Sequence, residues 1–347
     1  MKLVKINAFS DAENYILNTL LDNNFHSGED LSKALNLSRT TISNLVKKLE
    51  NNGLEIAKIP RRGYKLIYKT QRLKVDSESF NEINPFIDTF YFFEKIDSTN
   101  DFLLANSTFD GHAIAYSEYQ TLGKGRRGKE FLNSYGQHLM FSFGTHFGEV
   151  SAIAGLSIAI GICVIRALKN LGFNPQIKWP NDIYINGKKV CGILVESSVS
   201  KKGAWVVMGV GLNVGLTLSE NEKFSKLENI VDSLENVSRN QNSTDLKTYK
   251  DINLSQNLVD KTKLFTSIIK EINQGISIFK NDGLNPFLEE YKEYDLFYGK
   301  EVYLINDALK IEGINQGITS TGSLIVKTKE GTKHILCGEM SLREITH

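Results

Sequence analysis

The chain has 347 residues, enough for two or three domains, and 41% of them are hydrophobic, as in a soluble protein with a sizeable core. Cys163, Cys191 and Cys337 are too few and too widely spaced for a disulfide framework or a zinc site, which fits a reducing compartment. The N-terminus lacks the basic-then-apolar pattern of a secretory signal. The longest apolar run, Val150–Ile165, is shorter than the ~20 residues of a membrane span. We therefore expect a cytoplasmic protein with no membrane attachment, in which this run is a buried helix.

The net charge of +1 conceals an uneven distribution along the chain. Residues 1–74 contain 13 Lys and Arg but only 7 Asp and Glu, which leaves 28 basic and 33 acidic residues for the remainder. A basic head followed by an acidic body indicates that only the head contacts nucleic acid.

The head is predicted to contain three helices and a hairpin. Ala12–Leu21 has helical apolar spacing, and Ser27 and Ser38 are suitable N-caps for a second and a third helix. In the third helix Ile42, Leu45, Val46 and Leu49 form one apolar stripe. Residues 56–68 alternate around Arg61-Arg62-Gly63 as in a hairpin, so the pattern is typical of a winged helix-turn-helix with a basic wing.

The exposed face of the third helix and the tip of the wing carry the candidate DNA contacts. They are Arg39, Thr40, Ser43, Asn44, Lys47, Arg61 and Arg62. Such donor-rich side chains suit phosphates and base edges. The alternative is that the stripe is only core, the charges are a solvated face, and the small helical unit contacts protein.

Residues 75–88 are polar and contain Pro85, so we expect a linker. The body that follows shows helical stretches at Asn100–Ala105 and Val150–Asn170, and strand candidates at Phe90–Lys95, His112–Tyr119, His138–Thr145, Asp182–Ile185, Val190–Ser197 and Ala204–Val210. Asn186-Gly187 is a strong hairpin signal between two of these strands. The pattern predicts a mixed, largely antiparallel sheet with helices on one face, and hence an α+β fold.

The last third of the chain contains three kinds of segment. Residues 216–256 are rich in Ser, Asn, Lys and Glu, which indicates a mobile surface excursion. A helix is expected at Lys261–Phe279. From Leu296 onward, short alternating segments separated by glycines predict a small β-barrel.

The segment Gln120–Gly128 carries the strongest chemical signal, because three glycines and three cations alternate within six positions. Close backbone approach, exposed N–H groups and arginine forks suit a phosphate or a carboxylate. The segment also matches the dinucleotide-binding pattern G-x-G-x-x-G, but residues 129–136 are too short and interrupted for the packing helix that this site needs. A solvated basic turn without a ligand is the other alternative.

With these motifs placed, the chain resembles the bacterial bifunctional biotin protein ligase and biotin operon repressor nearly end to end. The motifs of that family occur in order: Asp97-Ser98-Thr99-Asn100, the glycine–cation segment, Lys178-Trp179-Pro180-Asn181-Asp182, Gly192-Ile193-Leu194-Val195-Glu196, Gly209–Asn213 and Gly338–Arg343. The resemblance implies a winged helix-turn-helix at 1–74, a linker at 75–88, a mixed-sheet ligase domain of the class II synthetase-like type at 89–295, and an SH3-like β-barrel at 296–347.

The resemblance also implies roles for individual residues. The biotin contacts are Ser98, Thr99, Asn100, Gln120, Lys124, Gly125, Arg126 and Lys189. The ATP and adenylate contacts are Gly123, Arg126, Arg127, Lys189 and Asn213, and the catalytic residues are Arg126, Lys189 and Asp182. Polar groups satisfy the ureido ring, cations neutralise the reacting anions, and Asp182 orients the acceptor amine or takes its proton. His112, His138 and His146 lack metal-ligand spacing, so no protein metal site is expected.

As for function, the resemblance implies that biotin and MgATP form biotinyl-5′-AMP, whose biotin then passes to a lysine of a biotin carboxyl carrier protein. The adenylate would also act as corepressor for operator DNA through a ligand-promoted homodimer. Three alternatives remain: a ligase whose head no longer regulates, a lipoate or other acyl-adenylate ligase, and a regulator that uses the body only as a sensor.

Some residues depart from the family pattern or allow a simpler role. Lys124 stands where an arginine is common, Phe131 stands where a tryptophan is usual, and no tryptophan follows Gly209–Asn213 to stack on adenine. Trp179 and Pro180 are expected to be structural. The simpler roles are helix capping for Ser98, Thr99 and Asn100, and pairing with an acid of the sheet for Arg127.

Overall fold

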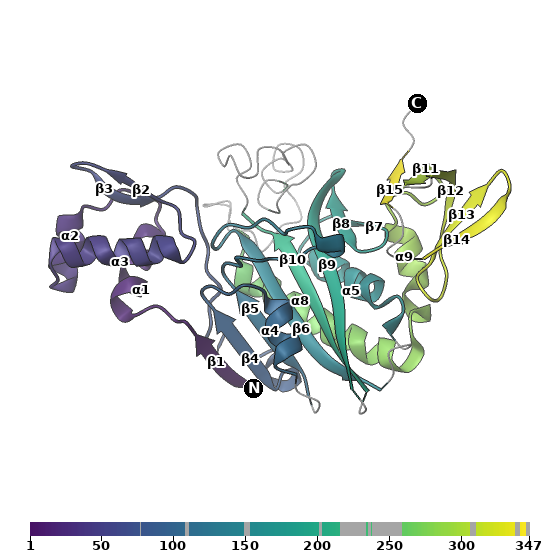
Figure 1. Cartoon of the computed structure of the whole chain (residues 1–347), viewed down its shortest axis with the longest axis horizontal. Coiled ribbons are helices and arrows are strands. Elements are labelled where there is room, and N and C mark those ends of the chain that lie inside the picture. The colour runs from purple at the N-terminus through teal and green to yellow at the C-terminus, as the bar shows by residue number, and fades with distance from the viewer. Residues whose placement is uncertain are drawn as a thin grey trace.

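The computed structural model describes residues 1–76, 78–107, 111–148, 153–200, 203–215, 259–305, 310–336 and 341–344, together with Leu234 and Val237. A helical head, a central body built on a large sheet, and a small β-rich domain follow one another along the long axis of the molecule (Figure 1). The predicted insertion at 216–256 lies outside the described residues, apart from Leu234 and Val237.

The head has the predicted three helices and wing. Its elements are α1 (Asp11–Leu20), α2 (Gly28–Leu35), α3 (Arg39–Asn51), β2 (Ile56–Ile59) and β3 (Gly63–Leu66). Each helix begins after a serine, because the hydroxyls of Ser10, Ser27 and Ser38 accept backbone N–H groups of the first turn. The predicted stripe of α3 is buried in the head core. At the wing, Gly63 has φ +101°, and a Cβ there would lie 2.0 Å from the carbonyl oxygen of His26, so the turn requires glycine.

The body is a mixed sheet whose strands run in the order β1-β4-β5-β6-β10-β9-β8-β7. The strands are β1 (Lys2–Ile6), β4 (Thr89–Phe93), β5 (Ala113–Ser117), β6 (His138–Phe147), β7 (Gln176–Lys178), β8 (Asp182–Ile185), β9 (Lys188–Ser200) and β10 (Gly203–Asn213). Among the described strands of this sheet, the β1–β4 and β4–β5 pairs are parallel and the other pairs are antiparallel. The predicted largely antiparallel sheet and the hairpin at Asn186-Gly187 are therefore confirmed.

Helices lie on both faces of the sheet, so the prediction that helices cover one face alone is wrong. The long helices α5 (Leu156–Asn170) and α8 (Lys261–Asp282) pack together behind the sheet (Figure 1). Phe265 of α8 contacts the rings of Phe90, Tyr116 and Phe141 across this face. The short helix α4 (Thr99–Ala105) packs on the opposite face, where Trp205 donates to the carbonyl of Leu103 at 2.9 Å.

Two segments differ from the sequence expectations near the head. Residues 2–6, which we assigned to the head, form β1 in the sheet of the body. The segment 75–88, which we expected to be a linker, includes a short 3-10 helix, η1 (Asn84–Phe86), and its side chains Phe80, Ile83 and Ile87 are buried in the core of the body. The sequence predicts a linker here because the residues around these three apolar side chains are polar.

The predicted helix at Val150–Asn170 begins only at Leu156, after Gly155 with φ +80°, and Val150 lies outside the described residues. It is buried as expected, and no helix in the described ranges is long and apolar enough to cross a membrane.

The C-terminal part begins after η4 (Asn285–Phe287) and α9 (Leu288–Tyr294). Its antiparallel sheet has the order β14-β13-β12-β11-β15. The strands are β11 (Glu301–Ile305), β12 (Lys310–Ile318), β13 (Leu324–Thr328), β14 (Gly331–Ile335) and β15 (Ser341–Glu344). Their inward side chains, such as Val302 and Leu304, join the core of the body. This domain therefore packs directly on the body.

Candidate active site

A cavity of about 690 Å³ lies where α4, the glycine–cation segment, the β8–β9 hairpin and β15 meet. Most of the predicted ligand residues line it: Ser98, Thr99, Asn100, Gln120, Lys124, Gly125, Arg126, Arg127, Asp182 and Lys189. Gly123 and Asn213 do not line it. Gly123 is buried behind the loop, where its carbonyl accepts the N–H of Phe131 at 2.8 Å, and Asn213 is buried at the end of β10.

One end of the cavity is neutral and polar. The side-chain oxygen of Gln120 accepts the backbone N–H of Thr99 at 2.7 Å and its hydroxyl at 3.2 Å. Ser142 from β6 donates to the Thr99 hydroxyl at 2.7 Å. The Gln120 amide nitrogen contacts only the thioether of Met140, at 3.4 Å, among the hydrogen bonds of the described residues. Because a thioether is a weak acceptor, this amide can donate to a ligand carbonyl.

The polar residues at the start of α4 have structural partners as well. Ser98 is the N-cap of α4, and its hydroxyl accepts the N–H of Asp101 at 3.3 Å, so the capping role is present. Asn100 lies inside the helix rather than at its cap, and its amide donates to Glu196 at 2.7 Å. Both residues line the cavity while they are held by the protein itself.

Glycines in β10 let two residues that line the cavity lie close to the sheet. A Cβ at Gly209 would lie 2.4 Å from the side-chain oxygen of Asn100, and one at Gly211 would lie 2.8 Å from the ring of Phe131. Phe131 itself lines the cavity and packs edge-on against His138. The alternating glycines of Gly209–Asn213 thus allow α4 and Phe131 to approach the sheet closely.

Cations converge on the other side of the cavity. Arg126 donates to the side chain of Asn181 at 2.9 Å, and Lys189 pairs with Asp182 at 2.6 Å. Lys178 reaches the hydroxyl of Tyr184 at 3.3 Å. Its pKa is lowered by burial, a shift that Asp182 opposes and that Arg343 and Lys189 reinforce. An anion in the cavity would relieve this crowding of positive charge.

Two cations of this group were not among the predicted site residues. Lys178 stands in the Lys-Trp-Pro-Asn-Asp motif, in which the sequence analysis assigned roles to other residues but none to this lysine. Arg343 comes from β15 of the C-terminal domain and lines the cavity with Leu342. Its proximity depends on domain packing, which includes a bond from the buried indole of Trp179 to the carbonyl of Gly322 at 3.0 Å. Trp179 thus makes a structural contact, and it also lines the cavity, as does Pro180.

The glycine–cation segment forms a tight loop and not the start of a packing helix. The N–H of Gly125 donates to the carbonyl of Lys129 at 2.6 Å, and Arg127 has φ +58° in the three-residue turn η2 (Arg126–Gly128). The dinucleotide alternative lacks the helix that it requires. Lys124 pairs with Asp101 of α4 at 2.7 Å, and this hydrogen bond raises the pKa of Lys124.

The candidate DNA surface is also present on the head. Arg39, Thr40, Asn44 and Lys47 are exposed on α3, and Ser43 is half-buried among them. Arg61 and Arg62 are exposed at the wing tip, where the Arg62 guanidinium lies 4.3 Å from the centre of the Phe25 ring. Among these candidate DNA contacts, Arg39 already has a partner in the protein, because it pairs with Glu29 of α2.

Three family models match consecutive parts of the chain. The Biotin/lipoate A/B protein ligase family matches residues 92–213, an HTH domain matches residues 13–65, and the Biotin protein ligase C terminal domain matches residues 297–343. They agree with the body, the head and the last domain of the structure.

Two proteins that align with nearly the whole chain, and one solved structure that aligns with most of it, are similar to this chain. The Bifunctional ligase/repressor BirA of Salmonella typhimurium is 31% identical over 335 residues, which cover 94% of this chain and 96% of that protein. The protein of the same description from Escherichia coli is 31% identical over 93% of this chain and 95% of its own length. Among solved structures, the biotin protein ligase from Aquifex aeolicus in complex with biotin and ATP is 27% identical with a TM-score of 0.59, over 74% of this chain and 100% of that one. The chain belongs to the biotin protein ligases, in the group of the bifunctional ligase/repressors.

Proposed function

We propose that the cavity forms biotinyl-5′-AMP from biotin and ATP and then transfers biotin to a lysine of a carrier protein. The observation that carries this proposal is the polarity of the cavity, which has neutral hydrogen-bonding groups around Thr99 and Gln120 and converging cations around Lys189. Biotin has a ureido ring at one end and a carboxylate at the other, so its two ends match the two ends of the cavity.

The neutral end suits the ureido group. Gln120 and Thr99 offer donors and acceptors there, and Ser142 holds Thr99 in place. A buried ureido group would be costly to leave unpaired. The carboxylate would then lie toward Gly125, Arg126 and Lys189, where cations converge.

In the first step, a carboxylate oxygen of biotin attacks the α-phosphorus of ATP, a mixed anhydride forms, and pyrophosphate leaves. Reactants and leaving group are all anions, so the protein contributes mainly alignment and neutralisation of charge. Arg126 and Lys189 are placed to do this, and Lys178 and Arg343 add charge on the same side. Mg²⁺ would enter with ATP as part of the substrate; the described residues contain no group of three or more acids, histidines or cysteines that could hold it.

In the second step, the amine of the acceptor lysine attacks the carbonyl carbon of the adenylate, and AMP leaves. The amine must lose a proton to become a nucleophile. Asp182 lies in the cavity, 2.6 Å from Lys189, and is suited to orient that amine or take its proton. The pair thus serves both steps, Lys189 in the first and Asp182 in the second.

We also propose that the head represses transcription, with the adenylate as corepressor. A single winged helix covers only a short half-site, so specific binding needs two heads and hence a dimer. The adenylate can promote that dimer only by ordering surfaces that the two protomers share, and the coupling must be reciprocal. The loop Gly123–Gly128 is the candidate for this ordering, because it contributes to the cavity and to the surface.

The central test is biotin-dependent release of pyrophosphate from ATP, followed by labelling of a carrier protein with radioactive biotin. We expect pyrophosphate release only with biotin, and label in a single carrier protein of the lysate. If lipoate or octanoate supports release and biotin does not, the ligase assignment to biotin is wrong. A monomer that binds operator DNA equally well with and without biotinyl-AMP would remove the corepressor role and leave the ligase in place.

A further inference from the structure

The head is attached to the body at both of its ends. At the N-terminal end, β1 pairs in parallel with β4 over the register Lys2↔Thr89 to Ile6↔Phe93. The N–H of Lys2 donates to the carbonyl of Asp88 at 2.7 Å. At the C-terminal end, the chain leaves the wing and runs along the body from residue 69 to residue 75. We call the stretch Thr89–Glu94, which receives both ends, the head seat.

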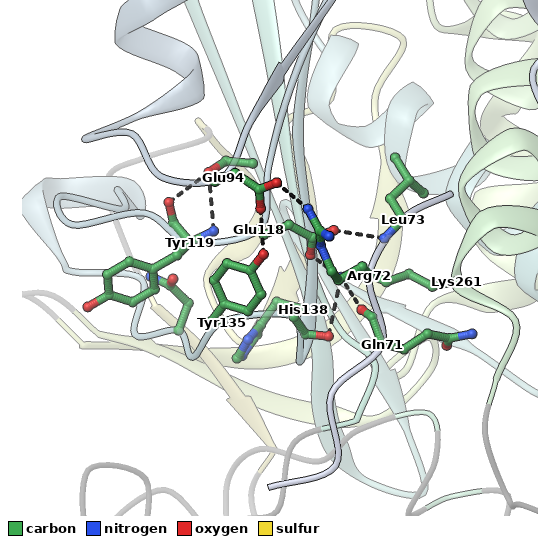
Figure 2. A network of polar contacts seen from close by, with 12 residues as sticks. Gln71, Arg72, Leu73, Glu94, Glu118, Tyr119, Tyr135, His138 and Lys261 are labelled. Atoms are coloured by element: carbon green, nitrogen blue, oxygen red, sulfur yellow. Dashed lines mark hydrogen bonds and ion pairs between the residues drawn. The ribbon is translucent and has the colours of Figure 1, made fainter. Parts of the chain in front are cut away.

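Glu94 receives the second attachment directly after β4. Its carboxylate is only 2% exposed, and it accepts the hydroxyl of Tyr135 at 2.5 Å and a guanidinium nitrogen of Arg72 (Figure 2). Arg72 also donates to the side chain of Asn14 in α1 at 3.0 Å. Tyr135 stacks on Phe9 of the head at 6.3 Å between ring centres. Arg72 thus connects a buried acid of the body to the first helix of the head, and Tyr135 connects it to Phe9, just before that helix.

A fully buried ion pair fixes the connecting chain behind this contact. Lys261 of α8 and Glu118 are both 0% exposed and lie 2.7 Å apart. Lys261 also donates to the carbonyl of Gln71 at 3.0 Å, and Glu118 accepts the N–H of Leu73 at 2.7 Å (Figure 2). The backbone on both sides of Arg72 is therefore held by the body. Because a buried charge is costly to unpair, this anchor is unlike a flexible linker.

Apolar contact completes the attachment. Tyr135 belongs to the buried cluster of the head, and Tyr119 packs against the same cluster. A Cβ at Gly53, directly after α3, would lie 2.5 Å from the Tyr119 ring, so the two surfaces are in close contact. The strand pairing of β1, the polar contact of Arg72 and the ring contact at Gly53 lie at three different places on the head, and three such contacts define an orientation.

We propose that the head seat holds the DNA-binding head in one fixed orientation on the ligase body, with β1, Arg72 and Tyr135 as its positioning elements. The inference rests on the proposed DNA binding, since a fixed head matters when two heads must meet half-sites at a set spacing. A head on a free linker would lose conformational freedom when it binds DNA, which would weaken binding. A head held on the body has lost that freedom before binding, so this cost does not reduce its affinity for DNA.

Spin labels on the head and the body test the orientation directly. We would label Lys48→Cys on α3 and Ser277→Cys on α8, both exposed positions, with Cys337 replaced by serine and with excess unlabelled protein to dilute contacts between labelled copies. The wild-type background should give one narrow distance distribution. Deletion of residues 2–7 combined with Arg72→Met should broaden it and weaken operator binding about tenfold through the restored freedom of the head. Lys58→Met is the matched control, because it breaks the ion pair with Glu50 inside the head, 2.6 Å long, and should leave the distribution narrow.

Biotin-dependent pyrophosphate release shows that the body of each variant is folded. Tyr135→Phe provides a milder variant, since it keeps the ring on Phe9 and removes only the hydroxyl at Glu94, and it should broaden the distribution partially. A broad distribution in the wild-type background, or a narrow one after the combined change, would overturn the inference. Failure of the wild-type protein to bind any duplex selected from a random pool would instead remove the repressor proposal. A narrow distance distribution in that protein would still support a fixed orientation of the head.

Discussion

The pair Lys189–Asp182 provides the sharpest test of how the cavity works. The two side chains lie 2.6 Å apart and are 32% and 27% exposed, so both remain within reach of water. Lys189→Met removes the cation that faces the reacting anions and leaves the carboxylate of Asp182 without its partner. We expect adenylate formation to be suppressed, while the fold of the cavity is retained.

The size of the effect follows from the charges. Two unit charges 4 Å apart interact by about 4 kcal/mol at an effective dielectric constant of about 20. Solvent reduces this at a one-third exposed site, so a loss of about 10²- to 10³-fold in adenylate formation is reasonable. The assay is biotin-dependent exchange of labelled pyrophosphate into ATP, which reports the first step alone.

Asp182→Asn separates the two roles. Alone, it should preserve exchange and slow transfer to the carrier protein, because the amine loses its acceptor. When Asp182→Asn is combined with Lys189→Met, the rate of exchange should be about tenfold higher than in Lys189→Met alone, because the carboxylate that repels the substrate anions is gone. A double variant no better than Lys189→Met, or an Asp182→Asn variant that loses exchange and transfer equally, would refute this division of labour.

Three further predictions concern the loop, the wing and the head seat. Arg126→Gly should weaken biotin binding and let the adenylate escape, which would appear as labelling of many lysines in a lysate, whereas retention of a single labelled band would contradict it. Neutralising Arg61 and Arg62 together should lower DNA affinity and flatten the salt dependence by roughly 2 units, measured by titration at several salt concentrations; an unchanged slope would exclude phosphate contacts by the wing. Burial raises the pKa of Glu94 to about 7; Glu118 reinforces this shift, whereas Arg72 and Tyr135 oppose it. The contribution of Glu94 to stability is therefore full below the ordinary pKa of a glutamate and is lost as the pH rises through 7. The free energy of unfolding should therefore fall between about pH 5 and 7 by at most about 1.4 kcal/mol per pH unit, and Glu94→Gln should flatten this dependence; equal slopes in the two proteins would contradict it.

The sequence predicted those parts of the fold that depend on local pattern. The serine caps of the head, the stripe of α3 and the Asn186-Gly187 hairpin are all set by neighbours within a few residues, and all are present. The strand β1 was missed because Lys2–Ile6 is short and its side chains are mostly exposed, so it is held mainly by backbone pairing with β4. Similarly, no local pattern shows that α4 packs on the face opposite α5 and α8.

The candidate site was predictable where a motif concentrates its residues and not where packing supplies them. Arg126, Asp182 and Lys189 stand in dense motifs and line the cavity. Gly123 and Asn213 stand in the same kind of motif but are not among the residues that line the cavity, because a motif does not distinguish contact with a ligand from close backbone packing. Arg343 reaches the cavity only because the C-terminal sheet packs on the body.

The three consecutive residues Glu118, Tyr119 and Gln120 show where sequence reasoning ends. The strand candidate His112–Tyr119 treats the first two as members of one alternating run, but β5 ends at Ser117 and the next three side chains have separate destinations. Glu118 pairs with Lys261, Tyr119 packs on the head, and Gln120 holds Thr99 in the cavity. Each partner is distant in the sequence or belongs to another domain, so no local pattern assigns it. Because one short segment connects the anchor of the head to the neutral end of the cavity, a change at any of the three residues should be examined for both ligation and DNA binding.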